Sequence, residues 1–400
     1  MASMSERVKQ AGIPLHRDPR ARSIAFQAAA VLFFLWAIWT IAANTVANME
    51  ERGIVLGVSW LEKIAPFQIG FSPFLSNTLG ENIYWQVFFI GVQNTIYVSV
   101  FGIIASTILG FIIGIMRLSP NWLVAKIASV YVEIFRNIPL LLWFFFWYFA
   151  AFLPILPAIR ESISFADAIF INKSGLFLPR PVADNAAGAT VFGLICIGAV
   201  VGAWFVARWA KQRQAKTGEQ FPIAAACLGM LIVIPFIGFF ITGSPFSLEY
   251  PEFGVFQLSG GINLTTEFFV CWFALTTYTS AFIGENVRGG IVAVSHGQTE
   301  AARALGLKHG QNFKLVVIPQ AMRVIIPPTI SQYLNLTKNS TLAIAIAYEE
   351  IASIWMGISL NTTGQSLLII AMTVGVFWTL SFLTSAFLNW YNKRVQLAER

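Results

Sequence analysis

Long apolar runs recur along the whole of this 400-residue chain, and they restrict its fold more than any other feature. Each run is about 20 residues or longer, the length that an α-helix needs to cross the hydrocarbon core of a bilayer. Hydrophobic residues make up 56% of the chain and charged residues only 11%, whereas a soluble domain is typically about a quarter charged. This composition excludes an ordinary cytosolic enzyme and a disordered scaffold, and it predicts an integral membrane protein.

The runs predict about eight transmembrane helices. Strands of an outer-membrane barrel would alternate apolar and polar residues over about ten positions, but these runs are continuously apolar, so the predicted fold is an all-α membrane protein. The seventh run contains Pro327-Pro328, and we expect the helix to be interrupted there. The predicted spans are Ile24–Ala43, Val87–Met116, Ser129–Leu153, Ala189–Ala207, Phe221–Thr242, Leu264–Gly284, Val324–Ala347 and Leu367–Trp390.

Lysine and arginine are distributed unequally between the segments that connect these spans. With a cytoplasmic N-terminus, 19 of the 26 basic residues lie in inside segments and 6 in outside segments. The inside segments are 1–23, 117–126, 208–220, 285–323 and 393–400. This bias follows the positive-inside rule and predicts a multi-pass membrane protein with both termini in the cytoplasm. The net charge of +7 is therefore explained by the basic residues of the inside segments. The sequence has no concentrated basic cluster of the kind that binds nucleic acid.

Catalytic and metal-binding patterns are missing from the sequence. Its three cysteines and three histidines form no CxxC, HExxH or ligand cluster, which argues against a disulfide or a metal site. A P-loop needs GxxxxGK[ST], so that backbone N–H groups and a lysine can hold phosphates. The nearest fragment, Asn172-Lys173-Ser174, lacks the preceding glycines. We therefore expect no catalytic residue, no metal and no cofactor in this chain.

The connecting segment 285–323 has a pattern of its own. Gln298–Leu305 is predicted to form a short amphipathic helix in which Ala301, Ala302 and Leu305 share an apolar arc, while Glu300 and Arg303 point elsewhere. Gly306 is a suitable residue to end this helix. The pattern alone fits two roles equally well: docking into a groove on another protein, or capping the helix bundle at the membrane surface.

A resemblance favours docking. Glu300-Ala301-Ala302, then Gly306, then Val316-x-Ile318-Pro319 resembles the EAA loop of ABC-importer permeases, with Val316 and Ile318 replacing isoleucine and leucine. In that family the loop forms a coupling helix that docks into a cleft on the ATP-hydrolysing subunit. The resemblance implies that the contacts with the ATPase are made by Glu300, Ala301, Ala302, Arg303, Leu305, Gly306 and Pro319.

The resemblance extends to other parts of the chain. The segments Tyr131–Leu142, Ala281–Gly290 and Leu336–Leu342 are similar to elements of polar-amino-acid permeases, although Asn339 replaces the usual aspartate. The similarity implies a five-helix type I importer core over 87–153 and 264–390. We expect the chain to begin with a cytoplasmic tail (1–23), an extra helix (24–43) and a periplasmic segment (44–86). The transmembrane domain (87–390) follows; it includes an inserted region (154–263) that carries two more helices, and the EAA loop (285–323). A cytoplasmic tail (391–400) ends the expected organisation.

This layout resembles the larger permease of general L-amino-acid ABC importers, and the resemblance implies a location in the bacterial inner membrane. The resemblance implies a heterodimer with a second homologous permease, two ATP-binding subunits that hold ATP and Mg, and a periplasmic amino-acid-binding protein. The expected function is import of L-amino acids, with broad specificity, by ATP-driven alternating access. The alternative is a secondary transporter driven by an ion gradient, in which Glu133 or Glu285 would carry protons.

Polar residues inside the spans are candidates for the translocation path, or else for hydrogen bonds between helices. Two pairs of opposite charge, Glu133 with Arg136 and Glu285 with Arg288, lie three residues apart and are expected to form structural ion pairs. Gly110-x-x-x-Gly114 and Gly198-x-x-x-Gly202 predict close helix packing. The path candidates are Asn94, Thr95, Ser99, Tyr278, Thr279, Asn335 and Lys338.

Overall fold

Two long helices, α3 (Tyr84–Met116) and α9 (Thr266–Val292), pack against each other and form the centre of the molecule. A Cβ atom on Gly110 would lie 2.6 Å from the Ile283 side chain, and one on Gly114 would lie 2.6 Å from Val287. Only glycine permits so close an approach, so the packing predicted for this pair is confirmed. The computed structural model describes residues 19–51, 57–73, 75, 80–254 and 258–395. Most of the expected tail 1–23, five residues of 391–400 and parts of 44–86 lie outside these ranges.

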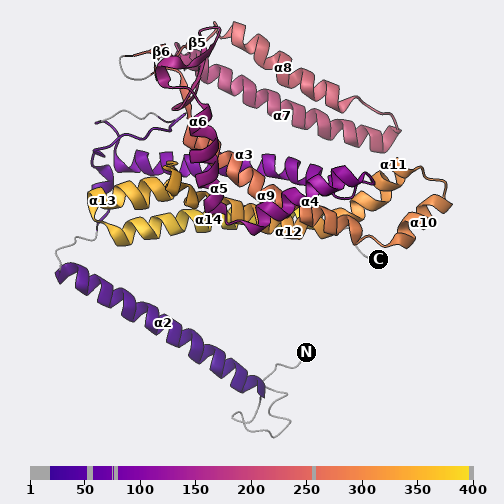
Figure 1. The fold of residues 1–400 in the computed structure, drawn as a ribbon, viewed down its shortest axis with the longest axis horizontal. Helices are drawn as coiled ribbons and strands as arrows, with labels where there is room; N and C mark the ends of the chain where they lie inside the picture. The colour runs from indigo at the N-terminus through magenta and orange to yellow at the C-terminus, as the bar shows by residue number, and fades with distance from the viewer. Residues whose placement is uncertain (1–18, 52–56, 74, 76–79, 255–257, 396–400) are drawn as a thin grey trace.

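The other core helices surround this pair (Figure 1). The element α12 (Ile318–Asn339) packs on α9 and continues as the 3₁₀-helix η5 (Ser340–Ile346). The π-helix η6 (Ala352–Ser359) and α13 (Leu360–Thr363) lead into α14 (Ser366–Val395). The short helices α10 (His296–Ala304) and α11 (His309–Asn312), followed by the π-helix η4 (Phe313–Val317), lie at the opposite end of the bundle from α13. We refer to these as the α10 end and the α13 end.

The helix α12 is continuous through Pro327-Pro328, so the predicted interruption is wrong. Both prolines lie on an exposed face of the helix, so their rings do not displace packed neighbours. The Thr329 hydroxyl donates to the Ile325 carbonyl at 2.8 Å and supports the same turn.

The third predicted span is bent. The amphipathic helix α4 (Trp122–Asn137) and the run formed by α5 (Leu140–Phe145), the π-helix η2 (Phe146–Phe152) and α6 (Leu153–Ile155) meet at 107°. Ile138 is extended because Pro139 follows it, and a residue before proline avoids the helical region.

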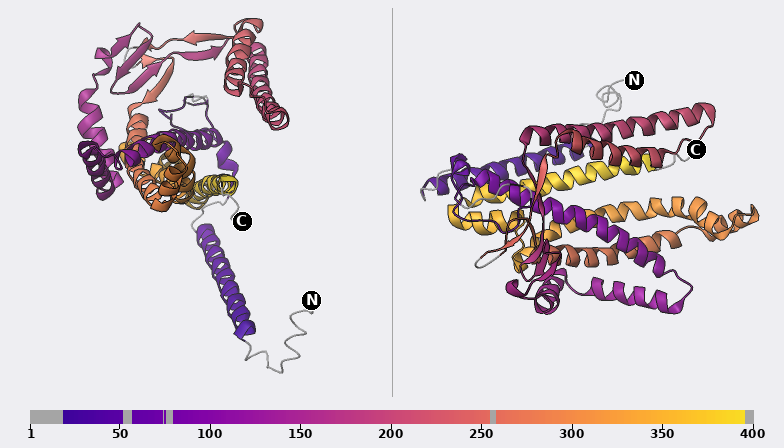
Figure 2. Two further views of the ribbon diagram at one scale, coloured as in Figure 1. Left: turned by 90° about the vertical axis from the view of Figure 1, so that its right-hand side faces the viewer. Right: turned by 90° about the horizontal axis from the view of Figure 1, so that it is seen from above.

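The inserted region carries its two predicted helices, α7 (Ala186–Thr217) and α8 (Ile223–Ile241), as an antiparallel hairpin. Figure 2 shows this hairpin running beside the bundle and joined to it through strands. The sequence analysis predicted no strands, because each is only two to four residues long. They are β1 (Ile163–Phe165), β2 (Ile169–Asn172), β3 (Gly175–Leu178), β4 (Arg180–Ala183), β5 (Phe246–Glu249), β6 (Glu252–Phe253), β7 (Leu258–Ser259) and β8 (Ile262–Thr265).

The strands form three small antiparallel sheets, of which the largest has the order β1-β2-β3-β8. The strand β8 leads directly into α9, and Thr265 caps that helix by accepting a hydrogen bond from the Phe268 N–H. Gly175 pairs with Thr265 at φ +132°, where a Cβ atom would lie 2.2 Å from the Leu264 carbonyl. A short 3₁₀ turn, η3 (Ile159–Glu161), precedes β1.

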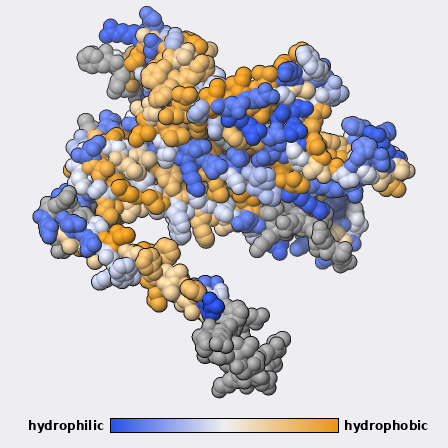
Figure 3. Space-filling model, turned by 60° about the horizontal axis from the view of Figure 1, so that its bottom comes forward, coloured by the Kyte–Doolittle hydropathy of each residue, from blue (hydrophilic) through white to orange (hydrophobic). Residues whose placement is uncertain are grey.

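The N-terminal helix α2 (Pro19–Glu51) contains the first predicted span and lies apart from the bundle. Its surface is mostly apolar between its two ends (Figure 3), and none of its most apolar stretch is buried within the described structure. The chain then passes through the 3₁₀-helix η1 (Ser59–Glu62), where Trp60 stacks on Trp355 of η6.

Six described helices are long and apolar enough to cross a membrane, and the bent pair adds a seventh. The helix α9 has 27 residues but is not among them, because its run of threonines and Tyr278 lowers its hydropathy. The mostly helical fold and multiple spans agree with the predicted membrane protein, while a count of eight stays a prediction.

Candidate functional site

The helix α10 forms the tip of the α10 end, where the picture shows mostly hydrophilic surface (Figure 3). It starts two residues before the predicted Gln298. Ala302 is buried, but Ala301 and Leu305 are exposed, Leu305 at 82%. The three residues predicted to share an apolar arc therefore do not share one environment. Ala302 faces the rest of the molecule, whereas Ala301 and Leu305, one helical turn apart, face outward.

Glu300 and Arg303 are also exposed on α10. The Glu300 carboxylate lies 3.1 Å from Nδ1 of His296, one turn earlier. The outward side chains of α10 are therefore accessible to another protein.

The end of α10 is fixed by Gly306. Its φ is +79°, in the left-handed region that favours glycine. Its N–H bonds to the Arg303 carbonyl at 2.9 Å, and the Leu307 N–H bonds to the Ala302 carbonyl at 3.1 Å. These two bonds are a Schellman motif. A Cβ atom at Gly306 would meet nothing within 4 Å, so the requirement is conformational and not steric.

Two contacts attach α10 to the bundle. The Gln320 amide of α12 donates to Gln298 Oε1 at 3.2 Å. Asn312 of α11 and Val317 of η4 are buried beneath the loop. Pro319 is the second residue of α12, in its first turn, and it is exposed. The tip is thus connected through α11 and η4 directly to α12.

Of the two predicted ion pairs, the structure brings one together. Arg288 Nη2 lies 2.6 Å from Glu285 Oε1, and Arg117 at the end of α3 also binds Glu285. Hydrogen bonds from Arg288, together with the charge of Arg117, hold the pKa of Glu285 below its ordinary value. The sequence analysis missed Arg117 because it is 168 residues away.

Glu133 and Arg136 form no ion pair within the described part of the chain, so the geometry differs from the prediction. The Arg136 guanidinium lies instead 5.3 Å from the centroid of the Phe282 ring on α9. The quadrupole of an aromatic face attracts a cation, and this contact also joins α4 to α9.

Asn94 and Thr95 on α3 are fully buried and hydrogen-bonded. The Asn94 amide donates to the carbonyls of Phe71 and Glu349, each at 2.7 Å. The Thr95 hydroxyl accepts the Ile351 N–H at 3.1 Å. These contacts fasten the turn before η6 and the segment before α3 to the core helix, which is the alternative that the sequence left open for buried polar residues.

Three other path candidates lie in the α3–α9 core. Ser99 and Thr279 are buried, and Tyr278 is half-buried with its ring 5.0 Å from Phe282. A contact that the sequence analysis missed lies beside them, where the Tyr131 hydroxyl of α4 bonds to Ser280 at 2.8 Å.

Asn335 and Lys338 are different, because both are exposed on α12. Together with Ser331 they form a polar stripe at i, i+4 and i+7, on one face of the helix. Lys338 lines an apolar groove of about 610 Å³ between α12, η6 and α14. We call Ser331, Asn335 and Lys338 the α12 stripe.

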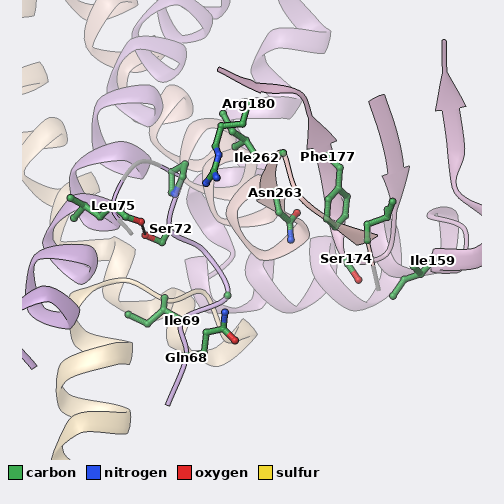
Figure 4. Close-up of a pocket in the computed structure, with 15 residues that line it drawn as sticks. Gln68, Ile69, Ser72, Leu75, Ile159, Ser174, Phe177, Arg180, Ile262 and Asn263 are labelled. Carbon is green, nitrogen blue, oxygen red and sulfur yellow. Dashed lines mark hydrogen bonds between the residues drawn. The ribbon is translucent and has the colours of Figure 1, made fainter. Parts of the chain in front are cut away.

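A polar cavity of about 430 Å³ lies between the segment before α3 and the strands of the inserted region (Figure 4). Its polar side chains are Gln68, Ser72, Ser174, Arg180 and Asn263, and we call it the outer cavity. The sequence analysis did not find it. Arg180 is one of three basic residues in the expected outside segment 155–187, so nothing in the sequence distinguished it.

No group of three or more His, Cys, Asp or Glu side chains that could hold a metal ion occurs within the described residues.

Comparison with known proteins places this architecture in a family. Residues 217–397 match the family described as "Binding-protein-dependent transport system inner membrane component". The general L-amino acid transport system permease protein AapQ of Rhizobium johnstonii is 42% identical over 383 residues, which cover 96% of this chain and 94% of that protein.

Two further relatives agree over a similar length. The putative amino-acid ABC transporter permease protein YhdX of Escherichia coli is 41% identical, over 96% of each chain. The glutamate/glutamine/aspartate/asparagine transport system permease protein BztB of Rhodobacter capsulatus is 39% identical, also over 96% of each chain. The chain therefore belongs to the family of amino-acid ABC transporter permeases, multi-pass proteins of the inner membrane.

Proposed function

We propose that the protein is a permease subunit of an ABC importer that moves L-amino acids inward by ATP-driven alternating access. The observation that carries this proposal is α10, a short capped helix at the tip of the bundle whose outward face offers Glu300, Ala301 and Leu305. This surface supports docking of α10 into an ATP-hydrolysing subunit, with Arg303 and Gly306 beside it and Pro319 at the base. The protein's partners in this proposal are a second homologous permease in a heterodimer, two ATP-binding subunits with ATP and Mg, and a periplasmic amino-acid-binding protein.

The same proposal orients the molecule. The α10 end faces the cytoplasm, with both termini, and the α13 end faces the periplasm. The excess of basic residues in the predicted inside segments supports this orientation.

The connection from α10 to α12 provides a route by which movement at the α10 end reaches the rest of the bundle. A displacement of α10 by ATP binding is transmitted through α11 and η4 to α12, which carries the α12 stripe. Packed helices adopt discrete arrangements, so a shift of α12 exchanges an outward-facing state for an inward-facing one. The ATPase supplies the difference in free energy because it binds ATP and ADP differently in the two states.

The α12 stripe is the best candidate for the surface of the translocation path. Polar and charged side chains exposed to lipid are costly, and in membrane proteins they face cavities or partner subunits. Lys338 and Asn335 are exposed in this chain, and an ammonium beside an amide suits the carboxylate of an amino acid. The names of the relatives, which include general L-amino acids and four specific ones, support broad specificity.

Co-purification tests the proposal. The chain is purified from its native membrane in detergent, and the ATPase activity of the eluate is measured with and without the binding protein and L-glutamine. Co-elution of an ATP-hydrolysing subunit, with activity stimulated by the loaded binding protein, is the expected result. A chain that elutes alone and transports amino acids in liposomes on a proton gradient would instead establish an ion-driven secondary transporter.

A further inference from the structure

Arg180, which lines the outer cavity, is paired with an opposite charge beside the cavity. Arg180 on β4 and Glu249 on β5 are cross-strand partners, with Arg180 Nη2 2.8 Å from Glu249 Oε2. Their side chains remain 48% and 39% exposed. An exposed ion pair contributes little to stability, so a ligand that supplies both charges can replace it at small cost.

Asn263, which lines the cavity, carries an unpaired acceptor. The Oδ1 atom of Asn263 is buried and has no hydrogen-bond partner among the described residues. Asn263 sits on β8 opposite Phe177 of β3, so the sheet fixes the position of its side chain. A buried acceptor of this kind is stabilised when a bound molecule donates an N–H to it.

The cavity is large enough for a small molecule. Its volume of about 430 Å³ falls in the range of about 300–1,000 Å³ that small-molecule sites occupy. A second cavity of about 660 Å³, lined by Phe71, Trp272 and other apolar side chains, shares Pro73 and Ile262 with it. An adjoining apolar space accepts the side chain of a ligand whose charged groups stay at the rim.

We propose that the outer cavity binds a free L-amino acid on the periplasmic side, before the amino acid reaches the α12 stripe. The α-carboxylate binds the guanidinium of Arg180, which presents its N–H donors in a planar fork. The α-ammonium binds Glu249 and donates to Asn263. Charges of both signs at the rim favour a zwitterion over a lipid phosphate, which would meet the Glu249 carboxylate. This inference rests on the importer function and orientation proposed above, and it gives the inserted region a role in substrate capture.

Binding by the assembled transporter tests the inference. The complete complex, without the binding protein, is placed in nanodiscs, and equilibrium dialysis measures the binding of radiolabelled L-glutamine. Arg180→Gln is expected to weaken binding at least tenfold, while Arg180→Lys restores part of it. Arg160→Gln is the matched control, because Arg160 is exposed in the same inserted region and does not line the cavity. L-Glutaminol, which lacks the carboxylate, is expected not to compete.

Stimulation of the ATPase by loaded binding protein is measured on the same preparations. If the wild type is stimulated but binds no glutamine, or if Arg180→Gln binds as tightly as the wild type, the cavity assignment is overturned and the importer function stands. Effective competition by L-glutaminol, or a co-purified phospholipid lost only in Arg180→Gln, also overturns it. Absence of any ATPase subunit would refute the importer function itself.

Discussion

Asn94 and Glu349 are 255 residues apart in the sequence, and the Asn94 amide donates to the Glu349 backbone carbonyl at 2.7 Å. The same amide nitrogen binds the Phe71 carbonyl, and the Phe71 N–H donates to the Glu349 carboxylate at 2.9 Å. One buried side chain of α3 therefore joins the segment that precedes α3 to the turn that precedes η6. The Tyr348 hydroxyl completes the connection by donating to the Asn94 carbonyl at 2.9 Å.

Asn94→Ala is expected to destabilise the protein by about 2 kcal/mol, because it leaves two buried carbonyls without a donor. The midpoint of thermal unfolding of the purified complex in detergent measures this. Asn361→Ala is the control, since Asn361 donates to Gly357 on an exposed surface and should change the midpoint little. Equal midpoints for the two variants would show that the Asn94 contacts do not hold the two segments in place.

Gly110→Ala is expected to destabilise the α3–α9 packing by about 1–3 kcal/mol, because the new methyl group overlaps Ile283. Gly198→Ala is the matched control on α7, where a Cβ atom meets nothing within 4 Å. Unfolding by detergent titration compares the two. A Gly110→Ala protein as stable as Gly198→Ala would mean that α3 and α9 are not so closely packed.

Gly306→Ala is expected to strain the end of α10 by about 1–2 kcal/mol, the usual cost of a left-handed conformation for a residue with a Cβ atom. We expect amino-acid uptake by the reconstituted complex to fall while the subunits stay assembled. Gly310→Ala, in the same loop, has open space around it and no left-handed φ, so uptake should be unchanged. Unchanged uptake in both variants would remove the conformational role of Gly306.

Lys338→Met is expected to slow import about tenfold or more, since it removes the cation from the α12 stripe; a charged contact of this kind is worth about 1.5–3 kcal/mol. The ATPase subunits should still co-purify. Lys126→Met, an exposed lysine on α4, is expected to transport normally. Normal import by Lys338→Met would exclude Lys338 from the path.

Apolar length and local motifs were sufficient to predict the membrane class, most of the spans and the position of α10. They could not show which face of a helix is buried, because a helix such as α8 is apolar on every side. This is why Asn94 and Thr95, which fasten distant segments, could not be distinguished in the sequence from Asn335 and Lys338, which are exposed.

The remaining errors concern the proline pair, the strands and the outer cavity. Pro327-Pro328 resembles a helix break, but its exposed position lets α12 continue. The strands of the inserted region are too short to show alternation, and the outer cavity exists only where β4, β8 and residues 68–73 and 75 come together. Pairings over such long sequence distances are not encoded in any local pattern.

The most direct test of the account is photo-crosslinking from Leu305 in native membranes. A photoreactive phenylalanine analogue replaces Leu305, which is 82% exposed on the tip, or, as a matched control, Ile155, which is 79% exposed on α6. The account predicts that the Leu305 probe forms an adduct with an ATP-hydrolysing subunit and that the Ile155 probe does not. A Leu305 probe that labels only lipid or nothing, in membranes that still take up the amino acid, would contradict the role of α10 as the coupling helix.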